Sequence, residues 1–214
     1  MKKIAFVFPG QGAQYVGMGR DFYEQFPESR EVFDRAGGLL GMDMKELCFE
    51  ENDRLDLTEY TQAAMITTIG AMLKKIETMG IRPQVAAGLS LGEYAALVTA
   101  GALSLYDAIR LVRLRGQLMQ EAVPQGVGGM AAVLGMGQEV VEQACKETEG
   151  VVTIANYNCP GQLVISGELA AVGACAEKLK ALGAKRVVPL NVSGPFHSPL
   201  LKPAGEKLAK ELEN

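Results

Sequence analysis

The stretch Gly88-Leu89-Ser90-Leu91-Gly92 follows directly on the short apolar run Val85-Ala86-Ala87. It is a Gly-x-Ser-x-Gly pattern, in which a serine stands on a sharp turn between a strand and a helix. Because the two glycines have no Cβ atoms, the backbone can fold tightly there and expose the serine hydroxyl. The sequence therefore predicts that Ser90 is a nucleophile on a strand-to-helix elbow.

A serine hydroxyl is a weak nucleophile at neutral pH and needs a base within hydrogen-bond distance. The sequence contains one imidazole, His197, in the stretch Ser193-Gly194-Pro195-Phe196-His197-Ser198. We therefore expect His197 to take the proton of Ser90 and to return a proton to the leaving group. A hydrolase of the usual kind has an Asp or Glu between serine and histidine in chain order, but Asp107 is explained by helix capping and the glutamates lie mostly on solvated helix faces. The third member of a triad is then a neutral group or absent.

The first half of the chain has the pattern of a parallel sheet with covering helices. Residues 4–8 form a short apolar run, typical of a strand buried on both faces of a parallel sheet. Residues 58–79 have apolar side chains at helical spacing, and a second strand near 85–89 leads into the elbow. The stretch 104–107 has a capping-box pattern and predicts the start of a helix that carries Arg115. These signals predict a large α/β-hydrolase-like domain with a parallel sheet and a nucleophile elbow.

The pattern changes after the glycine cluster at 126–129. Between 130 and 190, apolar strands and helices follow one another in the order βαββαβ. This order is that of the ferredoxin-like module, in which the βαβ unit is split. We therefore predict a small ferredoxin-like domain over residues 127–190, inserted into a large domain formed by residues 1–126 and 191–214.

The composition is that of an ordinary globular protein, with 48% hydrophobic and 21% charged residues among 214. A formal net charge of −4 argues against nucleic acid as the main partner, because phosphate binding needs clustered Lys and Arg. No apolar stretch is long enough to span a membrane, so we expect no membrane partner. The four cysteines form no Cys-x-x-Cys pair, and we expect reduced thiols in the cytoplasm and no metal site.

The chain also contains three further short motifs beside the serine and histidine stretches. They are Phe8-Pro9-Gly10-Gln11-Gly12-Ala13-Gln14, Arg115-Gly116-Gln117-Leu118-Met119 and Gly128-Gly129-Met130-Ala131-Ala132. In order and spacing, the five motifs resemble those of malonyl-CoA:acyl-carrier-protein transacylase of fatty acid synthesis, over essentially the whole chain. The resemblance implies that Ser90 takes malonyl from a coenzyme A thioester and passes it to the phosphopantetheine thiol of acyl carrier protein. It implies no cofactor beyond these two substrates.

The resemblance also implies roles for further residues. Arg115 binds the free malonyl carboxylate through its planar guanidinium, a geometry that lysine cannot reproduce. The backbone N–H groups of Gln11 and Leu91 form an oxyanion hole. Phe196 is a bulky residue before the histidine, which is expected to favour malonyl over α-methylated units. Acyl carrier protein is acidic, and the candidates for a basic docking surface are Lys178, Lys180, Lys185 and Arg186.

Two departures from the family pattern lead to expectations of their own. Leu89 stands where the family usually has histidine, and because leucine cannot hydrogen-bond we expect altered support of the elbow and some variation in rate. The family continues well past Asn214, so the resemblance implies a C-terminally shortened member. We expect the surface this leaves open to associate with a separate C-terminal fragment or with another copy. A stable, monodisperse monomer in solution with little exposed apolar surface would contradict that expectation.

Two alternatives to acyl transfer stay open at this point. A serine hydrolase or thioesterase would release the acid to water, whereas a transferase requires that water compete poorly at the acyl-enzyme. An inactive fragment would only bind carrier protein and would show carrier binding without any acyl-serine.

Overall fold

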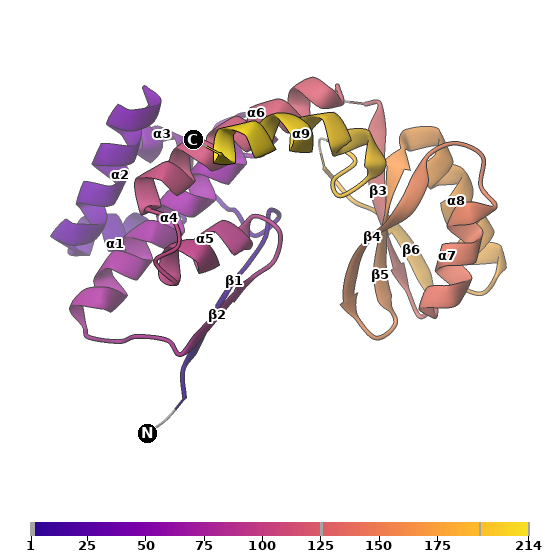
Figure 1. Cartoon of the computed structure of the whole chain (residues 1–214), viewed down its shortest axis with the longest axis horizontal. Coiled ribbons are helices and arrows are strands. Elements are labelled where there is room, and N and C mark those ends of the chain that lie inside the picture. The colour runs from indigo at the N-terminus through magenta and orange to yellow at the C-terminus, as the bar shows by residue number, and fades with distance from the viewer. Residues whose placement is uncertain (1–2, 125, 193, 214) are drawn as a thin grey trace. The chain divides into compact units, whose positions relative to one another are not determined.

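The computed structural model describes residues 3–124, 126–192 and 194–213 (Figure 1). Contacts within the chain gather into two compact units, Met1–Gln117 and Leu118–Asn214. The fold is mixed α/β, with a parallel sheet in the first unit and an antiparallel sheet in the second. The domain boundaries predicted at residues 126/127 and 190/191 stay a prediction.

The first unit is built on two parallel strands, which pair from Ala5 opposite Val85 to Phe8 opposite Gly88. Both strands were predicted from their apolar runs. The helix predicted at 58–79 is confirmed as well, and Gly80 just beyond it has a left-handed φ of 72°. In chain order the elements are β1 (Ala5–Phe8), α1 (Arg20–Gln25), α2 (Pro27–Leu40), α3 (Met44–Phe49), α4 (Thr58–Thr78), β2 (Val85–Gly88), α5 (Gly92–Thr99) and α6 (Leu105–Ala122), which continues into the second unit.

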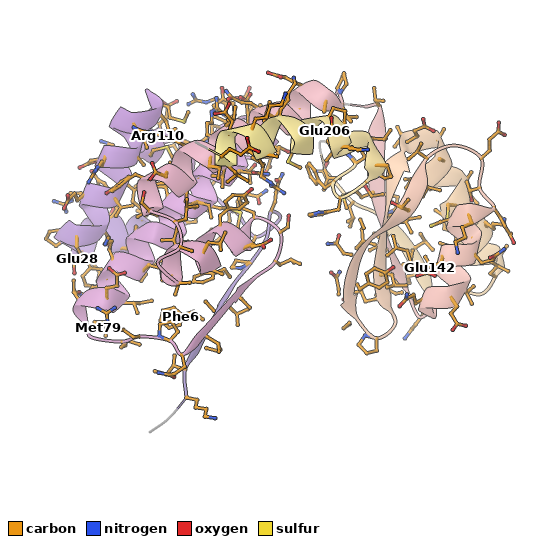
Figure 2. All side chains as sticks on the ribbon, viewed as in Figure 1. Phe6, Glu28, Met79, Arg110, Glu142 and Glu206 are labelled. Carbon is orange, nitrogen blue, oxygen red and sulfur yellow. The ribbon has the colours of Figure 1, made fainter. Side chains whose placement is uncertain are left out.

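The core of the first unit lies where α2, α3, α4 and α6 meet. It contains the fully buried side chains Phe33, Leu47, Ile66 and Ile109, one from each of these helices. Helices α2 and α4 also form an ion pair at the surface, between Lys75 Nζ and Glu28 Oε1 at 3.2 Å, and Figure 2 labels Glu28 at that end of α2. The packing of these side chains therefore holds α2, α3, α4 and α6 together in the first unit.

One side of the sheet stays open in this chain. Val7 of β1 is 76% exposed and Val85 of β2 is 62% exposed. Phe6, labelled beside β1 in Figure 2, helps to line an apolar groove of about 410 Å³ that β1 and its following loop form with α4. The prediction that β1 is covered on both faces is therefore wrong for the described residues. Helix α5 packs on both strands, β1 and α4 line an open groove, and no other described element covers Val7 and Val85. The association with a C-terminal fragment or another copy fits this surface and stays a prediction.

The second unit has the element order βαββαβ that the sequence predicted. Its sheet has the strand order β4-β5-β3-β6, with every neighbouring pair antiparallel. Because β5 pairs antiparallel with both β3 and β4, those two strands run in the same direction on either side of it. The elements are β3 (Gly128–Leu134), α7 (Gln138–Lys146), β4 (Val152–Cys159), β5 (Gln162–Glu168), α8 (Leu169–Ala181), β6 (Arg186–Pro189), the 3-10 turn η1 (Pro199–Leu201) and α9 (Lys202–Leu212).

Alternation along the strands creates the core of the second unit. Ala131 and Val133 of β3 are buried beside Leu163 and Ile165 of β5, two residues apart on each strand. Helix α8 adds a buried stripe at helical spacing with Val172, Cys175, Ala176 and Leu179. The two helices α7 and α8 contact this sheet, and Figure 1 shows them side by side.

The four cysteines form no disulfide in the described structure, and their reduced state stays a prediction. Cys145 and Cys175 lie in the core of the second unit with their Sγ atoms 3.8 Å apart. Burial raises the pKa of Cys48, in the first unit, to about 12, so that thiol is protonated at neutral pH. Across residues 3–124, 126–192 and 194–213, no helix combines the length and apolarity needed to cross a membrane.

Candidate active site

Ser90 stands on the predicted elbow between β2 and α5. Its φ of 50° lies in the left-handed region, which few residues other than glycine adopt. The turn is closed by backbone hydrogen bonds, from the N–H of Gly92 to the carbonyl of Leu89 at 2.9 Å and from the N–H of Glu93 to the carbonyl of Ser90 at 3.1 Å. A strained residue held by its surroundings at a strand end is typical of a nucleophile position.

The glycines of the elbow are needed because backbone packs directly on backbone. A Cβ atom on Gly88 would lie 2.0 Å from the carbonyl carbon and oxygen of Gly92. A Cβ atom on Gly92 would lie 2.4 Å from the carbonyl oxygen of Phe8, and one on Gly10 would lie 2.8 Å from that of Leu89. The elbow is thus pressed against the end of β1 and the loop that follows it.

Arg115 of α6 lies beside the elbow. Its Nη2 atom is 3.5 Å from Ser90 Oγ, and its Cζ atom is 5.8 Å from the centre of the Tyr94 ring. Burial lowers the pKa of the Arg115 guanidinium, an effect that the charges of Tyr94 and Glu93 oppose. Among the described residues, no Asp or Glu forms an ion pair with Arg115. A partly buried cation next to a candidate nucleophile is suited to the anionic end of a substrate, because charges removed from water are normally paired.

Gln11 and Leu91, the predicted oxyanion-hole residues, belong to the same unit as Ser90. Gln11 lies in the loop after β1, and its Nε2 donates a hydrogen bond to Thr58 Oγ1 at 3.1 Å. Leu91 follows the nucleophile directly, and its side chain is fully buried in the core. The first unit therefore brings together Ser90, Arg115 and Leu91 at the elbow. Gln11 follows Gly10, the loop glycine that packs against the carbonyl oxygen of Leu89.

Leu89 is 55% exposed, although it precedes the nucleophile directly. Its backbone N–H donates to the carbonyl of Phe8 at 3.1 Å, which continues the pairing of the two strands. Its side-chain Cγ would lie 3.5 Å from a Cβ atom on Gly10. The side chain thus covers the loop after β1, and the expected effect on rate stays a prediction.

His197 and Phe196 lie in the second unit, in a tight turn before η1. His197 is exposed and has a left-handed φ of 58°. The turn is closed by hydrogen bonds from the N–H of Phe196 to the carbonyl of Gly194 at 3.0 Å and from the N–H of Ser198 to the carbonyl of Pro195 at 3.3 Å. Since Ser90 and His197 belong to different units, their proton exchange stays a prediction, as does the selectivity expected from Phe196. Ser193, quoted with this stretch, lies outside the described residues.

Glycine also anchors this turn to the sheet of the second unit. A Cβ atom on Gly128, at the start of β3, would lie 2.4 Å from Cγ of Pro195. Gly128 therefore allows close packing under the histidine turn, whereas a Cβ atom on Gly129 would lie 2.8 Å from Cδ1 of Leu169.

Two of the four candidates for carrier docking are already in ion pairs. Lys178 Nζ lies 2.6 Å from Glu147 Oε2, and Lys180 Nζ lies 2.7 Å from Glu177 Oε1. Within the described residues, no three His, Cys, Asp or Glu side chains gather closely enough to hold a metal ion. The docking surface stays a prediction, with Lys185 and Arg186 as its better candidates.

Comparison with known proteins identifies the family. Residues 5–214 match the family model of the acyl transferase domain. The malonyl CoA-acyl carrier protein transacylase of Bacillus subtilis (strain 168) is 52% identical over 217 residues, which cover all of this chain and 68% of the relative. This chain belongs to the malonyl CoA-acyl carrier protein transacylases. The resemblance seen in the five motifs is thereby confirmed.

Solved transacylase structures have the same fold. The malonyl CoA-acyl carrier protein transacylase of Clostridium perfringens is 49% identical with a TM-score of 0.93, over 99% of this chain and 68% of that one. A second structure, a malonyl-transacylase in complex with its type II PKS acyl-carrier protein, is 44% identical with a TM-score of 0.95, over 99% of this chain and 70% of that one. The chain thus spans about two thirds of the length of the transacylases it matches.

Two residues that contact the predicted site residue Gln11 were not found from the sequence. Thr58 and Gln62, both 1% exposed, lie on α4 and contact the side chain of Gln11. The signal was present, because Thr58, Thr61 and Gln62 place polar groups three and four residues apart among the apolar residues of the helix predicted there. A polar stripe on a buried helix face indicates hydrogen-bond partners elsewhere in the chain.

Arg115→Lys is expected to reduce kcat/KM for malonyl-CoA roughly 10- to 100-fold, because lysine replaces a planar two-pronged donor by a point charge. The rate with acetyl-CoA, which has no free carboxylate, should change much less. Arg110→Lys is the matched control, since Arg110 lies on the same helix with its side chain 64% exposed (Figure 2). Equal losses for the two acyl groups, or an equal loss in the control, would contradict the role of Arg115.

Proposed function

We propose that this chain moves malonyl from coenzyme A to the phosphopantetheine thiol of acyl carrier protein through a malonyl ester on Ser90. The observation that carries the proposal is the guanidinium of Arg115 at 3.5 Å from Ser90 Oγ. A cation at that place selects acyl groups with an anionic end, and malonyl is the acyl group in the names of the relatives.

The proposed reaction has two half-reactions that use the same groups. Ser90 Oγ attacks the thioester carbonyl while His197 accepts its proton, and the backbone N–H groups of Gln11 and Leu91 bind the oxyanion. The carbon–sulfur bond then breaks, and His197 returns the proton to the departing sulfur, which leaves as the thiol of coenzyme A. The carrier thiol attacks the serine ester by the reverse of these steps, which restores the Ser90 hydroxyl.

The architecture proposed for this reaction is the one expected from the sequence. The elbow at the end of β2 supports an α/β-hydrolase-like large domain over residues 1–126 and 191–214. The strand order β4-β5-β3-β6 supports a ferredoxin-like small domain over residues 127–190. We further propose that the protein works in the cytoplasm, with free thiols and with no cofactor beyond its two substrates.

A carrier protein as partner is supported by a relative. The structure of a malonyl-transacylase in complex with its type II PKS acyl-carrier protein is 44% identical to this chain. The proposed acceptor is therefore an acyl carrier protein with its phosphopantetheine arm.

Intact-protein mass spectrometry after exposure to malonyl-CoA tests the proposal. We expect one malonyl adduct per chain, which is lost quickly on addition of holo-acyl carrier protein and slowly in buffer, because transfer requires that water compete poorly. The Bacillus subtilis relative serves as the positive control. Equal loss in buffer and with carrier would favour the hydrolase, and carrier binding without an adduct would favour the inactive fragment.

A further inference from the structure

We propose that Thr58, at the start of α4, is a positioning residue that holds the loop of Gln11 for catalysis. The inference rests on the proposed function, in which the backbone N–H of Gln11 binds the oxyanion. The first turns of α4 lie outside the five motifs, and the inference gives them a role in the reaction.

The amide of Gln11 is held at both ends by α4. Its Nε2 donates to Thr58 Oγ1 at 3.1 Å, and its Oε1 accepts a longer hydrogen bond from Gln62 Nε2 at 3.5 Å. Thr58 and Gln62 are four residues apart and therefore lie on the same face of the helix. Because both side chains are buried in the core of the unit, they form a rigid support for the amide.

The backbone around Gln11 needs such a support. Gln11 stands between Gly10 and Gly12, and Gly12 has a left-handed φ of 108°. Glycines permit many backbone conformations, so the local sequence does not by itself fix the direction of the Gln11 N–H. A side chain anchored on a rigid helix removes that freedom, and oxyanion donors are effective only when their direction is fixed in advance.

The same turn of α4 also supports the helix of Arg115. A Cβ atom on Gly116 would lie 2.5 Å from Cα of Glu59 and 2.9 Å from the carbonyl oxygen of Thr58, so α6 touches α4 there without an intervening side chain. Arg113 Nη2 and Glu59 Oε2 add an ion pair at 3.0 Å. One helix start thus contacts both the loop of the oxyanion donor and the helix of the carboxylate-binding arginine.

Thr58→Val removes the acceptor with little change in shape, and Thr58→Ser keeps it. We expect Thr58→Val to lower kcat for malonyl transfer about tenfold, a part of the loss that removal of a whole oxyanion donor causes. KM for malonyl-CoA should stay within about twofold, and Thr58→Ser should recover most of kcat. Thr67→Val is the matched control, because Thr67 is a buried threonine further along α4 that should leave kcat unchanged.

A double-mutant cycle separates positioning from general packing. If Thr58 acts through the amide of Gln11, Thr58→Val should have no further effect on kcat in the Gln11→Leu background. The proposal would be overturned if the loss of kcat in the double variant equalled the product of the losses in the two single variants. It would also be overturned if Thr58→Val kept the kcat of the wild type. Both results would count against it even if the malonyl adduct still forms.

Hydrogen exchange of the loop gives a readout that does not depend on activity. Thr58→Val should speed amide exchange over residues 10–12, while Thr67→Val should not. Unchanged exchange in Thr58→Val would overturn the positioning role. Absence of a malonyl adduct on the wild type with faster exchange in Thr58→Val would instead overturn the proposed function and leave the anchor of the loop established.

Discussion

Ser90→Ala is expected to abolish the malonyl adduct and to lower the transfer rate at least about a thousandfold. In the proposed reaction the acyl-enzyme ester forms on the Ser90 oxygen, so removing that oxygen removes the covalent step. Intact mass after exposure to malonyl-CoA checks the loss of the adduct, and peptide mapping of the wild type checks that malonyl lies on the peptide with the elbow.

Ser104→Ala is the matched control for that variant. Ser104 Oγ accepts from the N–H of Asp107 at 3.1 Å and caps α6, so its loss should lower the free energy of unfolding by about 1 kcal/mol. The adduct should nevertheless form at the wild-type level. A malonyl adduct that persists on Ser90→Ala would contradict the nucleophile.

Gly88→Ala is expected to have the second largest effect. The new Cβ atom would lie 2.0 Å from the backbone of Gly92, and backbone on both sides leaves no flexible group that can move away. We expect the free energy of unfolding to fall by more than about 3 kcal/mol, which is the upper end of the loss that overpacking substitutions usually cause. Because relief of the clash must displace Ser90, adduct formation should fall by more than about a hundredfold.

Gly38→Ala is the control for a glycine without such contacts. A Cβ atom on Gly38 would meet no atom within 4 Å, and the residue lies on the exposed side of α2. Alanine should stabilise the helix there by about 0.5–1 kcal/mol. Urea unfolding and the rate of adduct formation check both variants, and a Gly88→Ala protein with wild-type values would show that the elbow tolerates a side chain.

Local signals predicted most of the elements correctly. Helix α4 begins at the predicted residue 58 and ends one residue before the predicted 79, and the capping pattern at 104–107 marks the start of α6, where Ser104 Oγ and Asp107 Oδ2 are 2.5 Å apart. These features depend on side chains within about one turn of each other, so a linear pattern contains all that is needed. The burial of residues 4–8 on both faces was predicted wrongly for the opposite reason, because an apolar strand gives no sign of which element covers it.

The candidate site was predicted less completely than the elements. The elbow and its glycines were predicted from their spacing, and Arg115 came from the resemblance of its motif. Thr58 and Gln62 were not found, because their polar stripe indicates that a partner exists but not that the partner is Gln11, 47 and 51 residues away along the chain.

The amino-acid sequence by itself determined the elbow at Ser90 and the alternation of strands and helices, because periodicity and glycine spacing act between neighbouring residues. The order of the five motifs along the chain indicated the family. Only the tertiary structure placed Arg115 beside Ser90 and the amide of Gln11 on Thr58, across 25 and 47 residues of chain. Such contacts depend on how the buried faces of α4 and α6 pack together, and the free energy of that packing is spread over many side chains rather than encoded in any one stretch.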